Sequence, residues 1–113
     1  MTEKNDNKLE ELYERVIKLE DLVKYQPGAV VSRTLVDKET VTLTLFAFDK
    51  NQTLSEHTTP HDAVLQVLEG KAKVIIDNQR YELSEGESIV MPADVPHAVQ
   101  ATDKFKMYLT MVK

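Results

Sequence analysis

The amino-acid sequence predicts an all-β domain, an antiparallel sandwich or barrel, preceded by one N-terminal α-helix. Two observations predict this fold. After Gly28 the chain consists of short segments rich in β-branched and aromatic residues, separated by turn signals at intervals of about 8 to 12 residues. Before Pro27 the apolar residues follow the three-and-four spacing of an amphipathic helix. The chain of 113 residues therefore divides into a helix over residues 1–26 and a β domain over residues 27–113.

The N-terminal helix is predicted by a narrow apolar seam. Its members alternate steps of three and four residues: Leu9, Leu12, Val16, Leu19 and Val23. Acid-before-base pairs four residues apart, such as Glu11 with Arg15, support a helix weakly, and the Pro27-Gly28 pair ends it. We expect the seam to pack on the β domain. The alternative is a dimer contact through the seam, although two heptads are too short to hold a dimer alone.

The β domain is predicted segment by segment. The segments with strand composition are AVVSRTLV, TVTLTLFAF, AVLQVLEG, KAKVIID, RYEL, ESIVMP and FKMYLTMV. The turn signals between them are DKE, DKNQ, EG, DNQ, SEGE and ATDK. In TVTLTLFAF, threonines alternate with Val41, Leu43 and Leu45, which is typical of a strand with one face in water. Because no helical pattern interrupts these segments, an antiparallel sandwich or barrel is favoured.

Composition excludes several classes of function. The net charge is −5 and no basic block occurs, so nucleic acid and anionic membrane surfaces are poor partners. No apolar run approaches the roughly 18 residues that span a bilayer, and the N-terminus does not resemble a signal peptide. The chain has no cysteine, hence no disulfide, thiolate metal site or cysteine nucleophile. We therefore expect a cytoplasmic protein that binds neither nucleic acid nor membranes.

Residues from about 40 to 112 resemble a small single-domain cupin of the conserved-barrel type, cupin 2. Gly70, within the phrase VLEG, closes the first cupin motif. Gly86 opens the second motif, with Pro92 and His97 at the expected spacing. The resemblance implies that the β domain is a double-stranded β-helix, or jelly-roll barrel. It also implies that two copies pair through the barrel's sheet as a homodimer.

The same resemblance places candidate ligands. The family's metal site uses two histidines two residues apart and a glutamate in the first motif, and one histidine in the second. His57 and His97 match the first and last of these positions, while Thr59 replaces the second histidine and Ala63 replaces the glutamate. The resemblance therefore keeps two of four ligand positions and loses the only carboxylate.

His61 offers another route to a metal site. It shares strand parity with His57, but an extended strand separates residues four apart by roughly 13 Å. Pro60 permits a bend that would shorten this distance. Neutral imidazoles from His57, His61 and His97 would suit zinc, iron, nickel or copper, and the sequence does not choose among them. The alternative is that His61, in its proline-containing turn, is simply solvated.

Three functions from different classes follow. The first is a small-molecule-binding barrel with a few polar groups at its mouth, namely His57, Thr59, His61 and His97. The second, implied by the resemblance, is a metal-dependent oxygenase or isomerase that uses the three histidines. The third is a non-catalytic dimeric scaffold or interaction protein. No carboxylate matches a position that would orient either motif histidine, so no catalytic residue is assigned and whether the protein is an enzyme stays open. We favour the first function.

Overall fold

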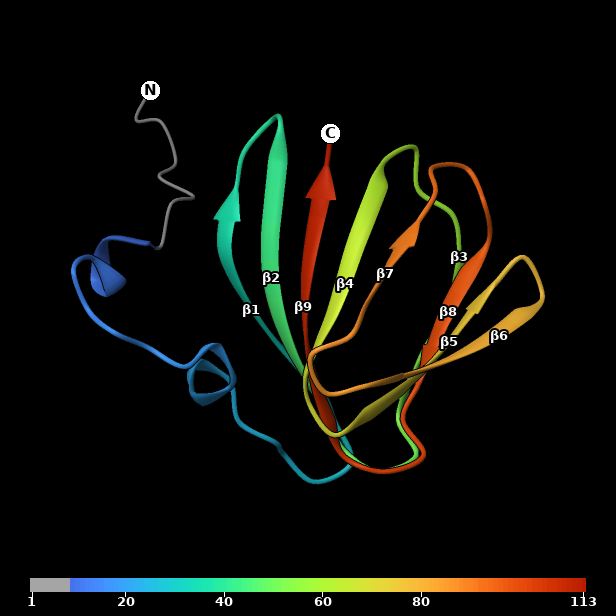
Figure 1. Cartoon of the computed structure of the whole chain (residues 1–113), viewed down its shortest axis with the longest axis horizontal. Helices are drawn as coiled ribbons and strands as arrows, with labels where there is room; N and C mark the ends of the chain where they lie inside the picture. The colour runs from blue at the N-terminus through green and yellow to red at the C-terminus, as the bar shows by residue number, and fades with distance from the viewer. Residues whose placement is uncertain (1–8) are drawn as a thin grey trace.

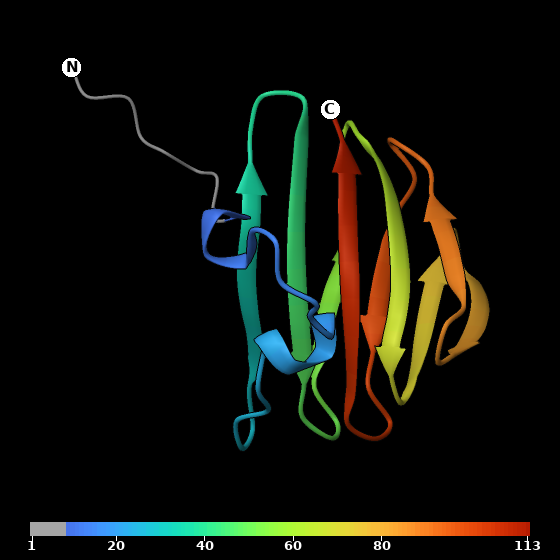
Figure 2. The ribbon, with the colours of Figure 1, turned by 60° about the vertical axis from the view of Figure 1, so that its left-hand side comes forward.

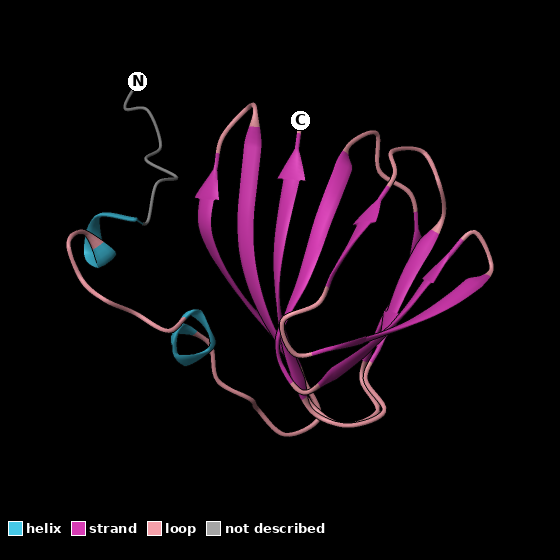
Figure 3. Ribbon diagram, in the orientation of Figure 1, coloured by secondary structure: helices cyan, strands magenta, loops and turns pink. Residues whose placement is uncertain are grey.

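The structure, a computed structural model, describes residues 9–113. Within these residues nine strands form two facing sheets, as Figures 1 and 3 show. The strands are β1 (Val30–Asp37), β2 (Val41–Phe48), β3 (Thr53–His57), β4 (Asp62–Glu69), β5 (Lys71–Ile76), β6 (Gln79–Ser84), β7 (Ser88–Met91), β8 (His97–Gln100) and β9 (Phe105–Val112). The predicted all-β jelly-roll fold is confirmed.

The two sheets are antiparallel throughout and are built mainly from strands distant in sequence. The five-stranded sheet has the order β1-β2-β9-β4-β7, and the four-stranded sheet has the order β3-β8-β5-β6. The last strand, β9, lies between β2 and β4, and the short strand β8 lies between β3 and β5. Each half of the chain therefore contributes strands to both sheets, which is the arrangement of a jelly roll.

The main hydrophobic core lies between the inner faces of the two sheets. Its largest fully buried side chains are Phe48, Leu65, Val67, Val74, Val99, Phe105 and Met107. The rings of Phe48 and Phe105 stack with their centroids 4.5 Å apart, which joins β2 to β9. Full burial of a side chain of this size contributes about 1.5 to 3 kcal/mol, so this core is the principal source of stability.

The predicted α-helix over residues 1–26 is wrong for the part that the structure describes. Residues 9–26 contain two single-turn 3-10 helices, η1 (Leu9–Leu12) and η2 (Leu19–Leu22), joined by irregular chain. Glu14 has a left-handed backbone with φ of 57°, and Lys18 is extended, so helical hydrogen bonding cannot continue between the turns. The first eight residues of the predicted helix lie outside the described residues. No helix within residues 9–113 is long and apolar enough to cross a membrane.

Tertiary packing explains why this segment is not one helix. A second apolar cluster covers the outer face of the five-stranded sheet, where the segment lies in Figure 2. The residues that the segment contributes are Leu9, Leu12, Leu19, Leu22, Val23 and Tyr25. Val16, at the centre of the predicted seam, is fully exposed. An isolated helix of this length is marginal, so contacts with the sheet decide its conformation. The expectation that the seam packs on its own sheet is confirmed for Leu9, Leu12, Leu19 and Val23 and is wrong for Val16.

Polar contacts fasten the same segment to β9 and β4. The buried Lys106 donates a hydrogen bond from Nζ to the Glu20 carbonyl at 2.7 Å, and its Nζ lies 4.9 Å from the centroid of the Tyr25 ring. Tyr25 donates its hydroxyl to Oε2 of Glu69 at 2.6 Å. Burial raises the pKa of Tyr25, and the bond to Glu69 adds to this effect. The tyrosine is therefore a stable hydrogen-bond donor between the segment and the sheet.

We expect Gly70→Ala to lower the free energy of unfolding more than Gly86→Ala does. Both glycines have positive φ, 78° and 86°, so each alanine adopts a left-handed backbone at a cost of about 1 to 2 kcal/mol. A Cβ at residue 70 would also lie 2.5 Å from the Lys104 carbonyl oxygen, whereas nothing lies within 4 Å of one at residue 86. Urea denaturation of both variants measures the difference. Equal decreases in the free energy of unfolding for the two variants would contradict the prediction, because they would show that the backbone at Lys104 shifts to accommodate the Cβ without loss of stability.

Candidate functional site

The inner face of the barrel is filled at one end and open at the other. Phe48, Phe105 and Met107 are fully buried. Further along the same strands the inner-face residues become half-buried, and we call this region the open end: Thr42, Thr44, Phe46, Leu109 and Met111. The two sheets spread apart toward this end, which carries the C-terminus in Figure 1. Solvent therefore reaches the inner face there.

His57 and His97 come together at this end of the four-stranded sheet. Leu54 on β3 pairs with Val99 on β8, and after a register shift His57 pairs with His97. In a regular ladder Glu56 would stand opposite His97, and His57 would face outward. The shift is a β-bulge, which re-aims side chains in this way. As a result the two rings lie edge to face, with centroids 4.4 Å apart and planes inclined at 67°.

Backbone carbonyls determine the tautomer of both rings. Nδ1 of His57 lies 2.8 Å from the Ser55 carbonyl oxygen, and Nδ1 of His97 lies 3.2 Å from that of Val95. A carbonyl oxygen only accepts, so each Nδ1 carries the hydrogen and donates it. A neutral imidazole has a single N–H, so Nε2 of each ring is a hydrogen-bond acceptor. No group within residues 9–113 donates a hydrogen bond to either Nε2.

The two histidines differ in their exposure to water. His57 is exposed, whereas His97 is 5% exposed. Burial lowers the pKa of His97 because it disfavours the charged imidazolium; the bond to the Val95 carbonyl opposes this effect, and the neighbouring His57 reinforces it. His97 is therefore a neutral acceptor at neutral pH.

The loop between β3 and β4 holds Thr59 and His61. The Thr59 hydroxyl donates to the His61 carbonyl at 3.0 Å, and the backbone N–H of His61 contacts the same hydroxyl at 3.4 Å. The hydroxyl thus stabilises the loop. His61 is half-buried and does not complete a metal site with the histidine pair, since residues 9–113 contain no group of three His, Asp or Glu side chains that could hold an ion. Of the predicted site residues, the structure brings together His57 and His97.

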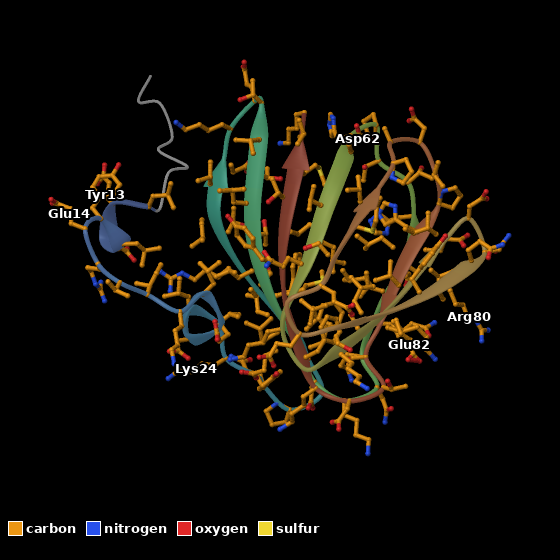
Figure 4. All side chains as sticks on the ribbon, viewed as in Figure 1. Tyr13, Glu14, Lys24, Asp62, Arg80 and Glu82 are labelled. Carbon is orange, nitrogen blue, oxygen red and sulfur yellow. The ribbon has the colours of Figure 1, made fainter. Side chains whose placement is uncertain are left out.

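Two aspartates that the sequence reading did not single out position this end of the barrel. Asp62, labelled in Figure 4, accepts a hydrogen bond from the Ala93 N–H on Oδ1 at 2.8 Å. Asp94, with φ of 63°, donates its backbone N–H to the Thr59 carbonyl at 2.7 Å. These bonds join the loop that follows His57 to the loop that precedes His97. The PADVP turn, with an aspartate that tolerates positive φ, was the available signal.

The fold and this site correspond to a known family. The sequence model of the cupin domain, Cupin_2, matches residues 44–113. The chain belongs to the cupin family. Among solved structures, a conserved protein of unknown function from Streptococcus pyogenes is 36% identical, with 100% of this cupin and 97% of that chain covered and a TM-score of 0.89.

Other relatives agree with this assignment. A cupin superfamily protein from Desulfitobacterium hafniense is 27% identical, with 88% of this chain and 91% of that chain covered and a TM-score of 0.84. A cupin 2 conserved barrel domain protein from Leptotrichia buccalis is 41% identical over 83% of this chain, with a TM-score of 0.81, and the match spans 46% of that longer chain. An uncharacterized protein from Aquifex aeolicus is 25% identical over 95 residues, which are 82% of this chain and 78% of that protein.

The side chains present do not fit the divalent ion that cupin motifs imply. The two imidazoles supply fewer than the three protein ligands usual for a catalytic zinc ion. Ala63 stands at the family's glutamate position and has no donor atom, and the Thr59 hydroxyl is bonded within its own loop. We therefore assign no reaction step to a metal in this cupin.

We expect protein purified without a nickel column to contain far less than one metal ion per chain, because two imidazoles hold a divalent ion weakly. Plasma mass spectrometry measures this content. The double variant Thr59→His/Ala63→Glu, which restores the family's four ligand types, is the positive control and should bind substantially more metal. Near-stoichiometric metal in the wild type that disappears in both His57→Ala and His97→Ala would contradict the expectation.

Proposed function

We propose that this cupin binds a small organic molecule at the open end of its barrel, beside the His57–His97 pair. One observation carries the proposal. The paired rings of His57 and His97 each have an Nε2 atom without a hydrogen-bond donor from residues 9–113, at the end where the apolar interior is only half-buried. Concave apolar surfaces with a few converging polar groups are the usual binding sites for small molecules.

The energetics of the buried histidine support a ligand at this end. An acceptor in an apolar environment that lacks a donor costs about 1 to 3 kcal/mol relative to one in water. The Nε2 atom of His97 avoids this cost only while water or a ligand reaches it. A ligand that supplies a donor and also covers Phe46 and Leu109 satisfies both the polar and the apolar surface. Its binding would therefore stabilise the folded chain.

A fragment screen by nuclear magnetic resonance tests the proposal. The set contains neutral, anionic and cationic molecules of about ten heavy atoms, and the probes are the methyl groups of Leu109 and Met111. We expect some of these fragments to shift both methyls in the wild type, and His97→Asn to weaken their binding severalfold. The control Glu82→Gln changes an exposed side chain on β6, away from the open end in Figure 4, and should bind as the wild type does.

The proposal fails if no fragment of any class shifts these methyls at millimolar concentration. It also fails if the fragments that bind do so on the outer surfaces of the sheets, because the open end would then be only a solvated rim.

A second proposal concerns assembly: we infer that two copies of this cupin pair through the outer face of β4, β7 and β9. Val90 and Val112 point outward from this face and are 58% and 55% exposed. Neither belongs to the outer apolar cluster that residues 9–26 cover, although Val112 pairs with Val41 at the margin of that cluster. A second copy would bury these valines and protect the free edge of β7.

Sedimentation equilibrium of Val112→Glu tests this pairing. We expect the wild type to be a dimer and the variant to dissociate at least tenfold more readily, since two glutamates would meet across a two-fold interface. Glu82→Gln serves as the control again and should leave the dimer intact. A monomeric wild type, or a dimer insensitive to Val112→Glu, would contradict the proposed face.

A further inference from the structure

We propose that the molecule recognised at the open end is uncharged and consists of a flat apolar body with one acidic O–H or N–H donor, of which a phenol is the simplest example. Its donor binds to Nε2 of His97. This inference rests on the proposed function and narrows it to one chemical class of ligand.

The position of Nε2 on His97 makes it the recognition atom. Every fully buried side-chain nitrogen or oxygen in residues 9–113 has a hydrogen-bond partner. Nε2 of His97 has none, so it must belong to the small exposed part of this ring. It is thus reachable from the open end while the rest of the ring is shielded from water. His57 is exposed, so water can donate a hydrogen bond to its Nε2 as well as a ligand can.

The surroundings of the pair select against charge. On its own sheet the inner-face neighbours of the pair are apolar: Ile76, which pairs with His97, and Val99, two residues along β8. On the facing sheet the inner row Met91, Ala63 and Met111 is apolar as well. Asp37 and Lys113, at the tips of β1 and β9, lie 3.5 Å apart and neutralise each other. Asp62 is engaged with the Ala93 N–H, and Glu56 lies in the bulge, exposed to water. Within residues 9–113 these charged groups do not lie on the inner apolar row, since Asp62 precedes the inward-facing Ala63. A carboxylate or an ammonium ion on the ligand would therefore lose its hydration there without gaining a counter-ion.

The half-buried walls favour a flat ring as the apolar body. Phe46 presents an aromatic side chain that is half-buried on the inner face, and aromatic pairs gain energy beyond the area that they bury. Met111, which pairs with Thr42 nearer the rim of the open end, adds a polarisable and adaptable thioether. Thr42 and Thr44 lie on the same face of β2 as Phe46. Their hydroxyls keep one side of the ligand's ring in contact with polar groups and water. The ring therefore packs on β2 and β9 while its donor reaches across to β8.

The ligand supplies a donor because Nε2 of His97 is an acceptor, and an acidic O–H or N–H gives the stronger hydrogen bond to an imidazole nitrogen. The bond to the Val95 carbonyl keeps the hydrogen on Nδ1, so Nε2 cannot turn into a donor by tautomer exchange without losing that bond. A ligand with an acceptor in this place, such as an ether oxygen, would face the lone pair of Nε2. An O–H in the same place forms a hydrogen bond instead, which corresponds to a gain of about fivefold to tenfold in affinity.

Titration with p-cresol and 4-methylanisole tests the inference, because the two molecules share their shape and differ by an O–H against an O–CH3 group. Binding is followed at the methyl groups of Leu109 and Met111 and at the histidine ring nitrogens. We expect p-cresol to bind about fivefold to tenfold more tightly and to shift the Nε2 resonance of His97 more than that of His57. The ions 4-methylbenzoate and 4-methylbenzylammonium should bind more weakly than p-cresol.

The variant His97→Phe keeps a ring in place of the imidazole and should abolish the preference for p-cresol; the comparison of ligands on the wild type stands even if this variant fails to fold. Equal affinities for p-cresol and 4-methylanisole, or tighter binding of either ion, would overturn the inference while leaving the proposed function intact. If none of the four molecules shifts the methyl resonances of Leu109 and Met111 while other fragments do, the inference is overturned in the same way. If no fragment of any class binds there, the proposed function and the inference fail together.

Discussion

The placement of β9 between β2 and β4 is the constraint on which the rest of the molecule depends. In this register Phe105 and Met107 face the inner core, while Lys106 and Tyr108 face outward. A slip of one residue would exchange the two sets and bring the lysine into the apolar interior. The same strand thus closes the barrel and supplies the surface on which residues 9–26 dock. Both apolar clusters include side chains of β9, so neither is complete without the C-terminal strand.

A single extra residue in β3 determines the chemistry of the open end. Without the bulge between Leu54 and His57, Glu56 would stand opposite His97 and place a carboxylate against a buried imidazole. Such a pair would favour a charged histidine and a hydrated site. With the bulge, the two imidazole rings lie edge to face, and each Nδ1 is held by the carbonyl two residues earlier, that of Ser55 in β3 and that of Val95 in the turn before β8. The site is therefore neutral and accepts hydrogen bonds because of backbone geometry as well as residue type.

The features that the sequence predicted are those encoded locally or by motif spacing. Alternating threonines mark β2, and the spacing of Gly70, Pro92 and His97 implied the fold and the meeting of His97 with His57. The strands β3 and β8 were not predicted, since β3 is polar and β8 is only four residues long. The bulge was missed because no single residue marks it. The N-terminal helix was predicted wrongly because its periodicity is genuine, yet sheet contacts outweigh the weak stability of a short helix.

The metal-coordinating side chains missing at the cupin positions indicate that the site binds a different class of molecule, rather than that it has lost its function. Ala63 pairs with Met91 on one side and Met111 on the other, so the row that would carry a carboxylate in a metal-binding cupin is apolar. Such a row has little affinity for a hard ion and suits an apolar ring. Meanwhile the carbonyl bonds still orient both imidazoles with Nε2 as the acceptor. The orientation that presents a lone pair to a metal also presents it to an O–H group. The two histidines can therefore bind a hydrogen-bond donor without a metal ion.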